Sequence, residues 1–204
     1  MEDFNSMAEN FDTKRRMDRA KIIADKIQTH VVDGHKKSAI EYGCGTGLVG
    51  LQLGNIFHKL LLVDSSIEMI KQVEQKLATA KIHTVSALCL DFMDDIPKGV
   101  QADYIFSSLV IHHIMDTEEV FRRLHSILKD DGHFLMVDLD KEDGSFHAKY
   151  PDFDGHNGFE HSALTAIATK AGFSNIEIET FYHDTKTFIR KESPYSLFIL
   201  DATA

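Results

Sequence analysis

Apolar and polar positions follow two different periods along this chain. Between 14 and 32, apolar residues recur every three or four positions, which predicts an amphipathic helix. The short apolar runs 38–43 and 59–64 are each bounded by glycine or aspartate, as is typical of buried parallel strands. The stretches 48–57 and 65–81 follow these runs and have helical patterns. The first third of the chain therefore alternates between strand and helix.

The same alternation continues to the C-terminal region and then changes. Further strand-like runs are 83–91, 103–110 and 132–140, with a helical stretch at 116–129 and another at 160–172. The last two runs, 173–189 and 195–204, have alternating apolar positions and a connection too short for a crossover helix. The pattern predicts an α/β fold: a Rossmann-like open sheet of about seven strands, mostly parallel with an antiparallel C-terminal strand pair, and helices on both faces.

The length of 204 residues suits one domain with a full hydrophobic core. We expect a single domain over 1–204, in which 1–35 form an N-terminal helical cap. The least regular segment is 141–161, and a loop of this length inside a compact domain is typical of a functional element. We interpret it as a substrate loop.

Composition and charge narrow the classes of partner. The net charge of −10 would repel polyphosphate, and the densest basic cluster is only Lys14, Arg15 and Arg16, so no nucleic-acid partner is expected. No apolar run approaches the length of a membrane span, and the N-terminus lacks the apolar core of a signal peptide. These features predict a cytoplasmic protein without a membrane partner. Cys44 and Cys89 lie far apart, which predicts reduced, buried thiols.

The stretch EYGCGTGLVG at 41–50 can be read in two registers. Gly45, Gly47 and Gly50 spell the G-x-G-x-x-G fingerprint of dinucleotide-binding enzymes, whereas Glu41 and Gly43 begin an acidic residue followed by G-x-G-x-G. A buried carboxylate within a strand is costly unless a cation approaches it. The phosphates of a dinucleotide would repel Glu41, whereas an ammonium group would pair with it. In this second register Gly50 is a close-packing helix residue.

Two further carboxylates follow strand-like runs. Asp64 ends the second run, where a carboxylate can accept hydrogen bonds from both ribose hydroxyls of an adenosine ligand. Asp91 and Phe92 end the third run, where a carboxylate and a ring could hold the amine and the face of an adenine. Together with Glu41, they favour an adenosine ligand with a positively charged end.

Several motifs in this order and spacing resemble those of a known family. IEYGCGTG, the aspartate at 64, LDFMDD, DYIFSSLVIHHIMD, LKDDGHFLMVDLD and TKAGFSNIEIE are similar to the successive motifs of class I S-adenosylmethionine-dependent methyltransferases. The resemblance covers roughly 8–201 and is strongest to the type 11/12 small-molecule branch, which includes ubiquinone-biosynthesis-like enzymes. The segment AENFD resembles an A-x-x-Y-D segment that folds over the cofactor, with Phe11 in place of tyrosine.

The resemblance implies S-adenosylmethionine as the cofactor and assigns roles to individual positions. Glu41 would hold the methionine ammonium, Asp64 the ribose and Asp91 the adenine amine, with Phe92 against the adenine face and Ser107 beside the sulfonium. The implied cofactor-binding residues are Glu41, Gly43, Gly45, Gly47, Asp64, Ser65, Asp91, Phe92, Ser107 and Phe11.

Candidate catalytic and acceptor residues lie after the fourth strand and in the loop. His113, and with it His112, follow the fourth run directly, and either imidazole could take a proton from the acceptor; the alternative is a purely structural histidine pair. Aromatic rings in the loop suit an acceptor pocket, and the residues expected to contact the acceptor are Phe146, Tyr150, Phe159 and His161.

A metal site in the loop is the competing interpretation of its polar residues. His147, Asp152, Asp154, His156 and His161 form neither a helical H-x-x-x-H arrangement nor an EF-hand order. The sequence therefore predicts no metal site.

The sequence predicts a methyltransferase that transfers a methyl group from S-adenosylmethionine to a small-molecule acceptor. Two other hypotheses stay open: a non-catalytic S-adenosylmethionine-binding protein, and an NAD-dependent oxidoreductase read from the G-x-G-x-x-G register. A monomer and a homodimer are equally compatible with the sequence.

Overall fold

The computed structural model describes residues 4–80, 82–150, 152–188 and 191–204. Within these residues, seven strands form one sheet in the order β3-β2-β1-β4-β5-β7-β6. The strands β1 to β5 run parallel, β7 pairs antiparallel with β5, and β6 pairs antiparallel with β7. Their bounds are β1 Ser38–Tyr42, β2 Lys59–Asp64, β3 Val85–Cys89, β4 Ala102–Ser108, β5 Leu128–Leu139, β6 Ser174–Phe188 and β7 Lys191–Thr203. The predicted fold class is confirmed.

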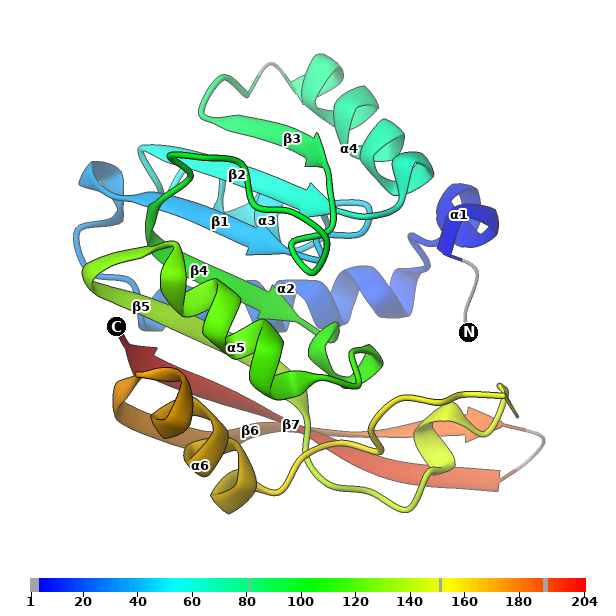
Figure 1. Cartoon of the computed structure of the whole chain (residues 1–204). Helices are drawn as coiled ribbons and strands as arrows, with labels where there is room; N and C mark the ends of the chain where they lie inside the picture. The colour runs from blue at the N-terminus through cyan, green and yellow to red at the C-terminus, as the bar shows by residue number, and fades with distance from the viewer. Residues whose placement is uncertain (1–3, 81, 151, 189–190) are drawn as a thin grey trace.

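Helices cover both faces of the sheet (Figure 1). One hydrophobic core lies between the sheet and α2, α3 and α4, and the other lies between the sheet and α5 and α6. The bounds are α1 Phe4–Met7, α2 Lys14–Thr29, α3 Gly50–Leu53, α4 Ile67–Ala80, α5 Thr117–Ser126 and α6 His161–Ala171, with 3₁₀ turns η1 Ala8–Asn10, η2 Gly34–Lys36, η3 Ile111–His113 and η4 Ser145–His147. Burial on two faces explains why the parallel strands are almost wholly apolar.

Local signals in the sequence set several helix ends. The Thr13 hydroxyl accepts a hydrogen bond from the Arg16 backbone N–H at 3.3 Å, and the Asp116 carboxylate caps α5 by accepting from the Glu119 N–H at 3.0 Å. The last helix, α6, ends at Gly172, whose φ of 106° lies in the left-handed region. The caps of α2 and α5 fix the loops before these helices, and Gly172 fixes the turn after α6.

Two predicted boundaries and one burial prediction were wrong. The helix expected over 48–57 is only the four-residue α3, and β5 begins at Leu128, inside the stretch predicted to end a helix. The register of β4 with β5 shifts between Ala102↔Leu128 and Tyr104↔His133, and Asp131, which lies between these two pairs in β5, has a φ of 58°. Cys44 is buried as expected, whereas Cys89 is exposed because it ends β3, an edge strand of the sheet.

The order of the strands directs the connections to one edge of the sheet. The chain steps outward from β1 to β2 and β3, then returns to the other side of β1 to form β4 and β5. The connections therefore diverge after β1 and β4, and an open α/β sheet binds its ligands at this place. Residues 1–3 of the predicted cap and residue 151 of the predicted loop lie outside the described residues.

The C-terminal strand pair reaches beyond the rest of the sheet. β7 pairs with β5 from Leu139↔Leu197 to His133↔Thr203, but β6 and β7 continue to pair as far as Phe188↔Lys191. The extension lies on the same side as α1 (Figure 1). In the described part of the chain, no helix combines the length and the apolar character that crossing a bilayer requires.

The packing of Gly50 yields the first prediction. A Cβ on Gly50 would lie 2.2 Å from Glu41 Oε2 and 2.4 Å from Leu62 Cδ2. We expect Gly50→Ala to lower the free energy of unfolding by about 1–3 kcal/mol in denaturant titration, because overpacking outweighs the better helix propensity of alanine. In a Glu41→Ala background the loss should be smaller, because the carboxylate is gone. Equal losses in both backgrounds would contradict this account.

Candidate functional site

A cavity of about 780 Å³ opens at the carboxyl edge of the parallel strands. Its wall is formed by the ends of β1, β2 and β3, the turn after β4, the first half of α2 and the loop between β5 and α6. Several predicted site residues line it, namely Phe11, Glu41, Gly43, Gly45, Asp64, Ser65, Asp91, His112, His113, Phe146 and Tyr150. The fold thus brings residues from distant parts of the sequence to one space.

Glu41 is the least compensated group in this wall. Its side chain is 1% exposed, and Oε2 has no hydrogen-bond partner among the described residues. Burial raises the pKa of Glu41 to about 8, and the negative charge of Asp64 adds to this rise, while a hydrogen bond from the Gly50 backbone opposes it. Without a ligand, the carboxyl is therefore mostly protonated at neutral pH. A cation entering the cavity would stabilise its ionised form.

Asp64 is held in place by the backbone around it. Oδ2 accepts a hydrogen bond from the Gly45 N–H at 2.7 Å, and Oδ1 accepts one from the Ser66 N–H at 2.8 Å. Burial raises the pKa of Asp64, and the two backbone donors oppose the rise. Each carboxylate oxygen keeps a further lone pair for a donor in the cavity.

Asp91 is held by hydrogen bonds from a tyrosine hydroxyl and from the backbone of the turn that follows it. Oδ1 accepts hydrogen bonds from the Tyr42 hydroxyl at 3.1 Å and from the Met93 N–H at 2.8 Å. Burial and the nearby Asp91 carboxylate raise the pKa of Tyr42, so this hydroxyl stays a donor. Glu41, Asp64 and Asp91 therefore lie on three adjacent parallel strands or directly after them, along one wall of the cavity.

The glycines of the loop have the backbone conformations that a tight turn requires. Gly43 has a φ of 72°, and a Cβ there would lie 2.5 Å from both methyl groups of Val110. Gly47 has a φ of 77°, but it does not line the cavity, contrary to the sequence prediction. A Cβ on Gly47 would point to Leu51 and Val73, because the turn directs this position into the core.

The segment before α2 covers one side of the glycine loop. The Phe11 ring lies 3.8 Å from the position that a Cβ of Gly45 would take, and the Arg16 guanidinium lies 4.1 Å above this ring. Asp12 bonds to the Thr46 hydroxyl and to Lys76, whose Nζ is 2.6 Å away. These contacts attach the N-terminal segment to the loop.

Two residues predicted to contact the cofactor lie in the core instead. The Phe92 ring is fully buried and stacks on Tyr42 with a centroid distance of 5.5 Å and an interplanar angle of 8°. Ser107 is fully buried and its neighbour Ser108 lines the cavity, because successive side chains of β4 point to opposite faces. Met93 and Ser108, the neighbours of Phe92 and Ser107, line the cavity instead.

Two predicted acceptor residues also lie away from the cavity. Phe159 forms a bridge with Asp140 and packs against Phe198, which fixes it beside the end of β5. His161 begins α6, and its Nε2 lies 2.6 Å from Asp140 Oδ1. The loop returns to the sheet before these residues, so only its part up to Asp154 lines the cavity.

Three histidines meet in the wall of the cavity. The ring centroids of His112 and His113 are 4.1 Å apart, and the ring of His147 lies 5.0 Å from His112 and 5.7 Å from His113. Burial, reinforced by neighbouring imidazoles, lowers the pKa of His113 to about 4 and that of His147 to about 3. His113 is therefore neutral and only weakly basic at neutral pH, which weakens the hypothesis that it is a general base.

Asp138, and the meeting of His147 with the histidine pair, are functional features that the sequence reasoning missed. His112 Nδ1 lies 2.6 Å from Asp138 Oδ1, and both side chains are almost fully buried. A signal for Asp138 was present, because it is a charged residue within the apolar run of β5. His147 lay outside any recognisable spacing, since 34 positions separate it from His113.

Positively charged side chains gather beside the C-terminal strand pair. Arg15, Arg19, Lys149 and Lys186 line the cavity there. Arg15 pairs with Asp184 at 2.7 Å, whereas Arg19 donates to the Tyr195 hydroxyl at 3.4 Å. This end of the cavity is thus cationic, whereas the end at Glu41 is acidic.

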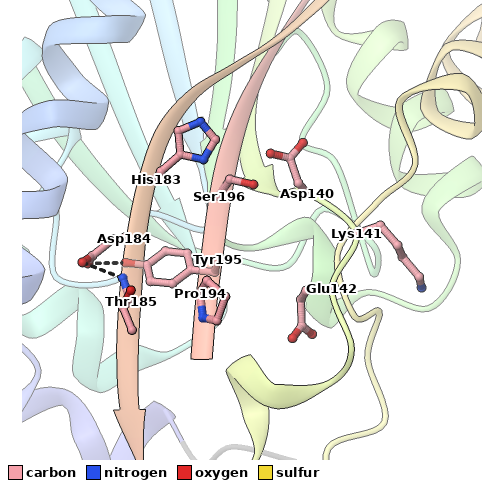
Figure 2. A pocket seen from close by; sticks show the side chains of 9 residues that line it. All are labelled: Asp140, Lys141, Glu142, His183, Asp184, Thr185, Pro194, Tyr195 and Ser196. Atoms are coloured by element: carbon pink, nitrogen blue, oxygen red, sulfur yellow. Dashed lines mark hydrogen bonds between the residues drawn. The ribbon is translucent and has the colours of Figure 1, made fainter. Parts of the chain in front are cut away.

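A second, smaller cavity of about 370 Å³ is lined by residues of the strand pair and of the segment after β5 (Figure 2). Tyr195 belongs to the walls of both cavities, and its hydroxyl donates to Asp184 at 2.9 Å. Figure 2 shows Asp184 bonded both to this hydroxyl and to the Thr185 N–H. The smaller cavity contains acidic residues, Asp140 and Glu142 among them. We assign it no role.

Comparisons with known proteins agree on one family. A family model described as a methyltransferase domain matches residues 14–178. An uncharacterized methyltransferase of Schizosaccharomyces pombe is 29% identical over 81% of this chain and 64% of its own length. Phosphoethanolamine N-methyltransferase 2 of Caenorhabditis elegans is 29% identical over 58% of this chain and 27% of its own length. The chain thus spans less than two thirds of either relative.

A solved structure agrees in fold. Phosphoethanolamine N-methyltransferase 2 of Haemonchus contortus, in complex with S-adenosyl-L-methionine, superposes with a TM-score of 0.67 and 20% identity. The match covers 82% of this chain and 48% of that protein. At this level of identity, the likeness concerns the fold.

The environment of Glu41 predicts how stability depends on pH. Between its ordinary pKa of 4.5 and its folded pKa of about 8, the native state keeps a proton that the unfolded chain releases. The ligand-free protein should therefore lose stability through Glu41 as pH rises through this window. Glu41→Gln should remove this loss, making the variant more stable than the wild type at pH 9 by a few kcal/mol, at about 1.4 kcal/mol per pKa unit.

Denaturant titrations at pH 5 and pH 9 would measure this difference. Glu74→Gln is a matched control, because Glu74 is exposed on α4. For the Glu74→Gln variant, the difference in unfolding free energy between the two pH values should equal that of the wild type. Parallel pH profiles for the wild type and Glu41→Gln would contradict the burial of an uncompensated carboxyl.

Proposed function

Because this chain belongs to the class I S-adenosylmethionine-dependent methyltransferase family, we propose that it transfers a methyl group from that cofactor to a small-molecule acceptor. The observation that carries the proposal is the buried Glu41 carboxyl at the end of β1, whose Oε2 lacks a partner among the described residues. The cofactor has an ammonium group at its methionine end, which is the cation that Glu41 requires.

The other two carboxylates suit the adenosine part of the same ligand. We assign the ribose hydroxyls to Asp64, whose oxygens keep free lone pairs next to the glycine loop, and the adenine amine to Asp91. Gly43, Gly45 and Ser65 would border the ligand between them. The three acids would repel the diphosphate of a dinucleotide, so this arrangement does not support the NAD-dependent alternative.

The packing of Gly50 accounts for the third glycine of the dinucleotide fingerprint without a dinucleotide ligand. It is the first residue of α3, and a side chain there would meet Glu41 and Leu62. The third glycine of the fingerprint is therefore needed for packing around the carboxylate, whichever ligand binds.

Within the reaction, the chain's own residues would position the acceptor. A sulfonium is an activated methyl donor, so alignment of the acceptor and exclusion of water are the main tasks of the protein. We infer that the Phe11 segment and the first half of the loop, with Phe146 and Tyr150, close the cavity around the two reactants. These aromatic walls would exclude water and hold the acceptor.

The cationic residues beside the C-terminal strand pair suggest which small molecules fit the cavity. Arg15, Arg19 and Lys186 lie on the wall near Phe146 and Tyr195, within a chain that carries a net charge of −10. A local cationic patch against such a field favours an acceptor with a carboxylate or phosphate group. We therefore propose an anionic small-molecule acceptor.

Calorimetric titration with S-adenosylhomocysteine tests the cofactor site. We expect binding to release up to one proton at pH 7, because the ligand ammonium lowers the pKa of Glu41 from about 8. The proton shows as a difference in heat between phosphate and Tris buffers. Between pH 6 and pH 8 the affinity should rise with pH, since only the ionised carboxylate pairs with the ammonium.

Variants separate the roles of the carboxylates. Glu41→Gln should bind more weakly and without proton release, and Asp64→Asn should weaken binding about 10- to 100-fold by removing a charged acceptor. Asp95→Asn is the control, because Asp95 is exposed outside the cavity. A folded wild-type protein that gives no heat with about 1 mM S-adenosylhomocysteine would overturn the site assignment.

Turnover assays distinguish an enzyme from a non-catalytic binding protein. With S-adenosylmethionine, we expect methylation of some hydroxy or amino acids and phosphate esters, and slower methylation of their neutral amides and alcohols. Arg19→Gln should raise KM for the charged acceptors about 10-fold or more, because a charge-assisted contact is lost. Arg122→Gln is the control, since Arg122 is exposed on α5 and pairs with Glu119. Equal rates for charged and neutral acceptors would refute the anionic class, and no turnover with any acceptor would favour the non-catalytic protein.

A further inference from the structure

The histidine cluster has the composition of a transition-metal site. His112 and His113 belong to η3 after β4, and His147 ends η4 in the loop after β5. One ligand nitrogen of each lies within 4.8 Å of the others, and all three residues line the large cavity. Two short turns from different parts of the chain thus direct three imidazoles to one point.

A buried carboxylate fixes the orientation of the first imidazole. Asp138 is fully buried, and its Oδ1 lies 2.6 Å from His112 Nδ1, while its Oδ2 accepts from the His112 backbone N–H at 3.2 Å. The carboxylate requires the proton to be on Nδ1, so the lone pair of this imidazole is on Nε2. A carboxylate behind a histidine is the usual support of a metal-binding imidazole.

The second imidazole has a nitrogen without a partner. His147 is 4% exposed, and its Nδ1 has no hydrogen-bond partner among the described residues. The ring stacks on Phe153 with a centroid distance of 3.7 Å and an interplanar angle of 8°, which fixes its plane. A buried polar nitrogen held rigidly in this way is costly unless a ligand satisfies it.

The loop packs closely over the histidine pair. The His156 backbone N–H donates to the His112 carbonyl at 2.7 Å, and a Cβ on Gly155 would lie 2.3 Å from the same oxygen. Phe4 of α1 meets the His113 ring edge-on at 5.3 Å. The position of the cluster is therefore fixed by contacts from α1 and from the loop.

We propose that His112, His113 and His147 bind a transition-metal dication of the zinc type. An all-imidazole set suits Zn²⁺, Co²⁺ or Ni²⁺ better than Mg²⁺ or Ca²⁺, which prefer oxygen ligands. Tetrahedral zinc with bonds of about 2.0–2.1 Å needs ligand nitrogens about 3.4 Å apart, so the rings close on the ion by small side-chain movements. Three ligands leave a fourth position open toward the cavity.

The open position identifies the reacting group of the acceptor, an inference that rests on the proposed function. A metal-bound hydroxyl oxygen of the acceptor releases its proton to solvent at a lower pH than the free hydroxyl. The oxygen then forms the new bond to the methyl carbon as the bond from this carbon to sulfur breaks, and sulfur keeps the electron pair. The acceptor is accordingly a hydroxyl compound, and the product is its methyl ether.

Metal binding is testable on the full chain purified without a histidine tag. Titration with Zn²⁺ should give one strong site per chain, and Co²⁺ should give the intense visible absorption of a four-coordinate ion, lost when Zn²⁺ is added. His147→Gln and His112→Gln should each lower the affinity at least 100-fold, and Asp138→Asn should lower it about 10- to 100-fold. His58→Gln is the control, because His58 is exposed outside the cluster.

A second measurement avoids variants that fail to fold. In the wild-type protein, Zn²⁺ should shift the ring-nitrogen NMR signals of the three cluster histidines and leave those of exposed His35, His58 and His83 unchanged. Absence of a one-to-one site tighter than about 10 µM, or shifts confined to the exposed histidines, would overturn the metal site. Calorimetry with S-adenosylhomocysteine on the same sample keeps the two proposals apart, because cofactor binding without metal binding rejects this inference alone.

Methylation assays with and without Zn²⁺ test the link to the acceptor. Apo protein prepared with a chelator should lose most activity toward hydroxyl acceptors and regain it with Zn²⁺. Metal binding combined with unchanged turnover after its removal would limit the ion to a structural role and reject the hydroxyl assignment.

Discussion

The buried carboxyl of Glu41 is the constraint on which this site depends. A strand in the middle of a parallel sheet offers no water to an acidic side chain, and burial therefore raises the pKa of this group to about 8. The surrounding sequence accommodates the group: Gly50 has no side chain in the space that Glu41 Oε2 occupies, and a hydrogen bond from the Gly50 backbone to the carboxyl partly offsets the cost of burial. Such a costly arrangement fits the proposed cofactor, whose ammonium group brings the opposite charge.

The topology of the sheet sets where the carboxylates, the histidines and the cationic residues lie around the cavity. The crossover from β3 back to β4 separates the strands β1 to β3, near whose ends the three carboxylates lie, from the turn that carries the histidine pair. The extended β6–β7 pair then brings Tyr195 and Lys186 to the far side of the cavity, where the loop adds Phe146. The three carboxylates therefore come from the β1–β3 half of the sheet, whereas the cationic residues come from α2, the loop and β6. This separation fits the proposed pair of a positively charged cofactor and an anionic acceptor.

Family membership and local geometry answer different questions about this protein. The match over 14–178 establishes a methyltransferase domain of the family that uses S-adenosylmethionine, and the solved structure agrees with it in fold. Neither identifies the acceptor, because the chain covers only part of each relative's length. The acceptor must be inferred from the residues that line the cavity beside α2, the loop and the C-terminal strand pair.

The sequence by itself determined the sheet, the family and the three carboxylates. Strand and helix periodicities are local, and an acidic residue at the end of an apolar run is visible without coordinates, so Glu41, Asp64 and Asp91 could be predicted. Only the tertiary structure decided which neighbours of these residues face the cavity. Phe92 and Ser107 turned into the core because strand alternation and side-chain packing set the direction of a side chain within one residue.

The histidine cluster lay beyond sequence reasoning for a related reason. His147 joins His112 and His113 because η4 folds back over the turn after β4, and Asp138 reaches them from β5 through strand pairing. Contacts between residues this far apart along the chain depend on how loops pack on the sheet. No spacing rule contains this information, because loop conformation is set by tertiary packing and not by a repeating backbone geometry.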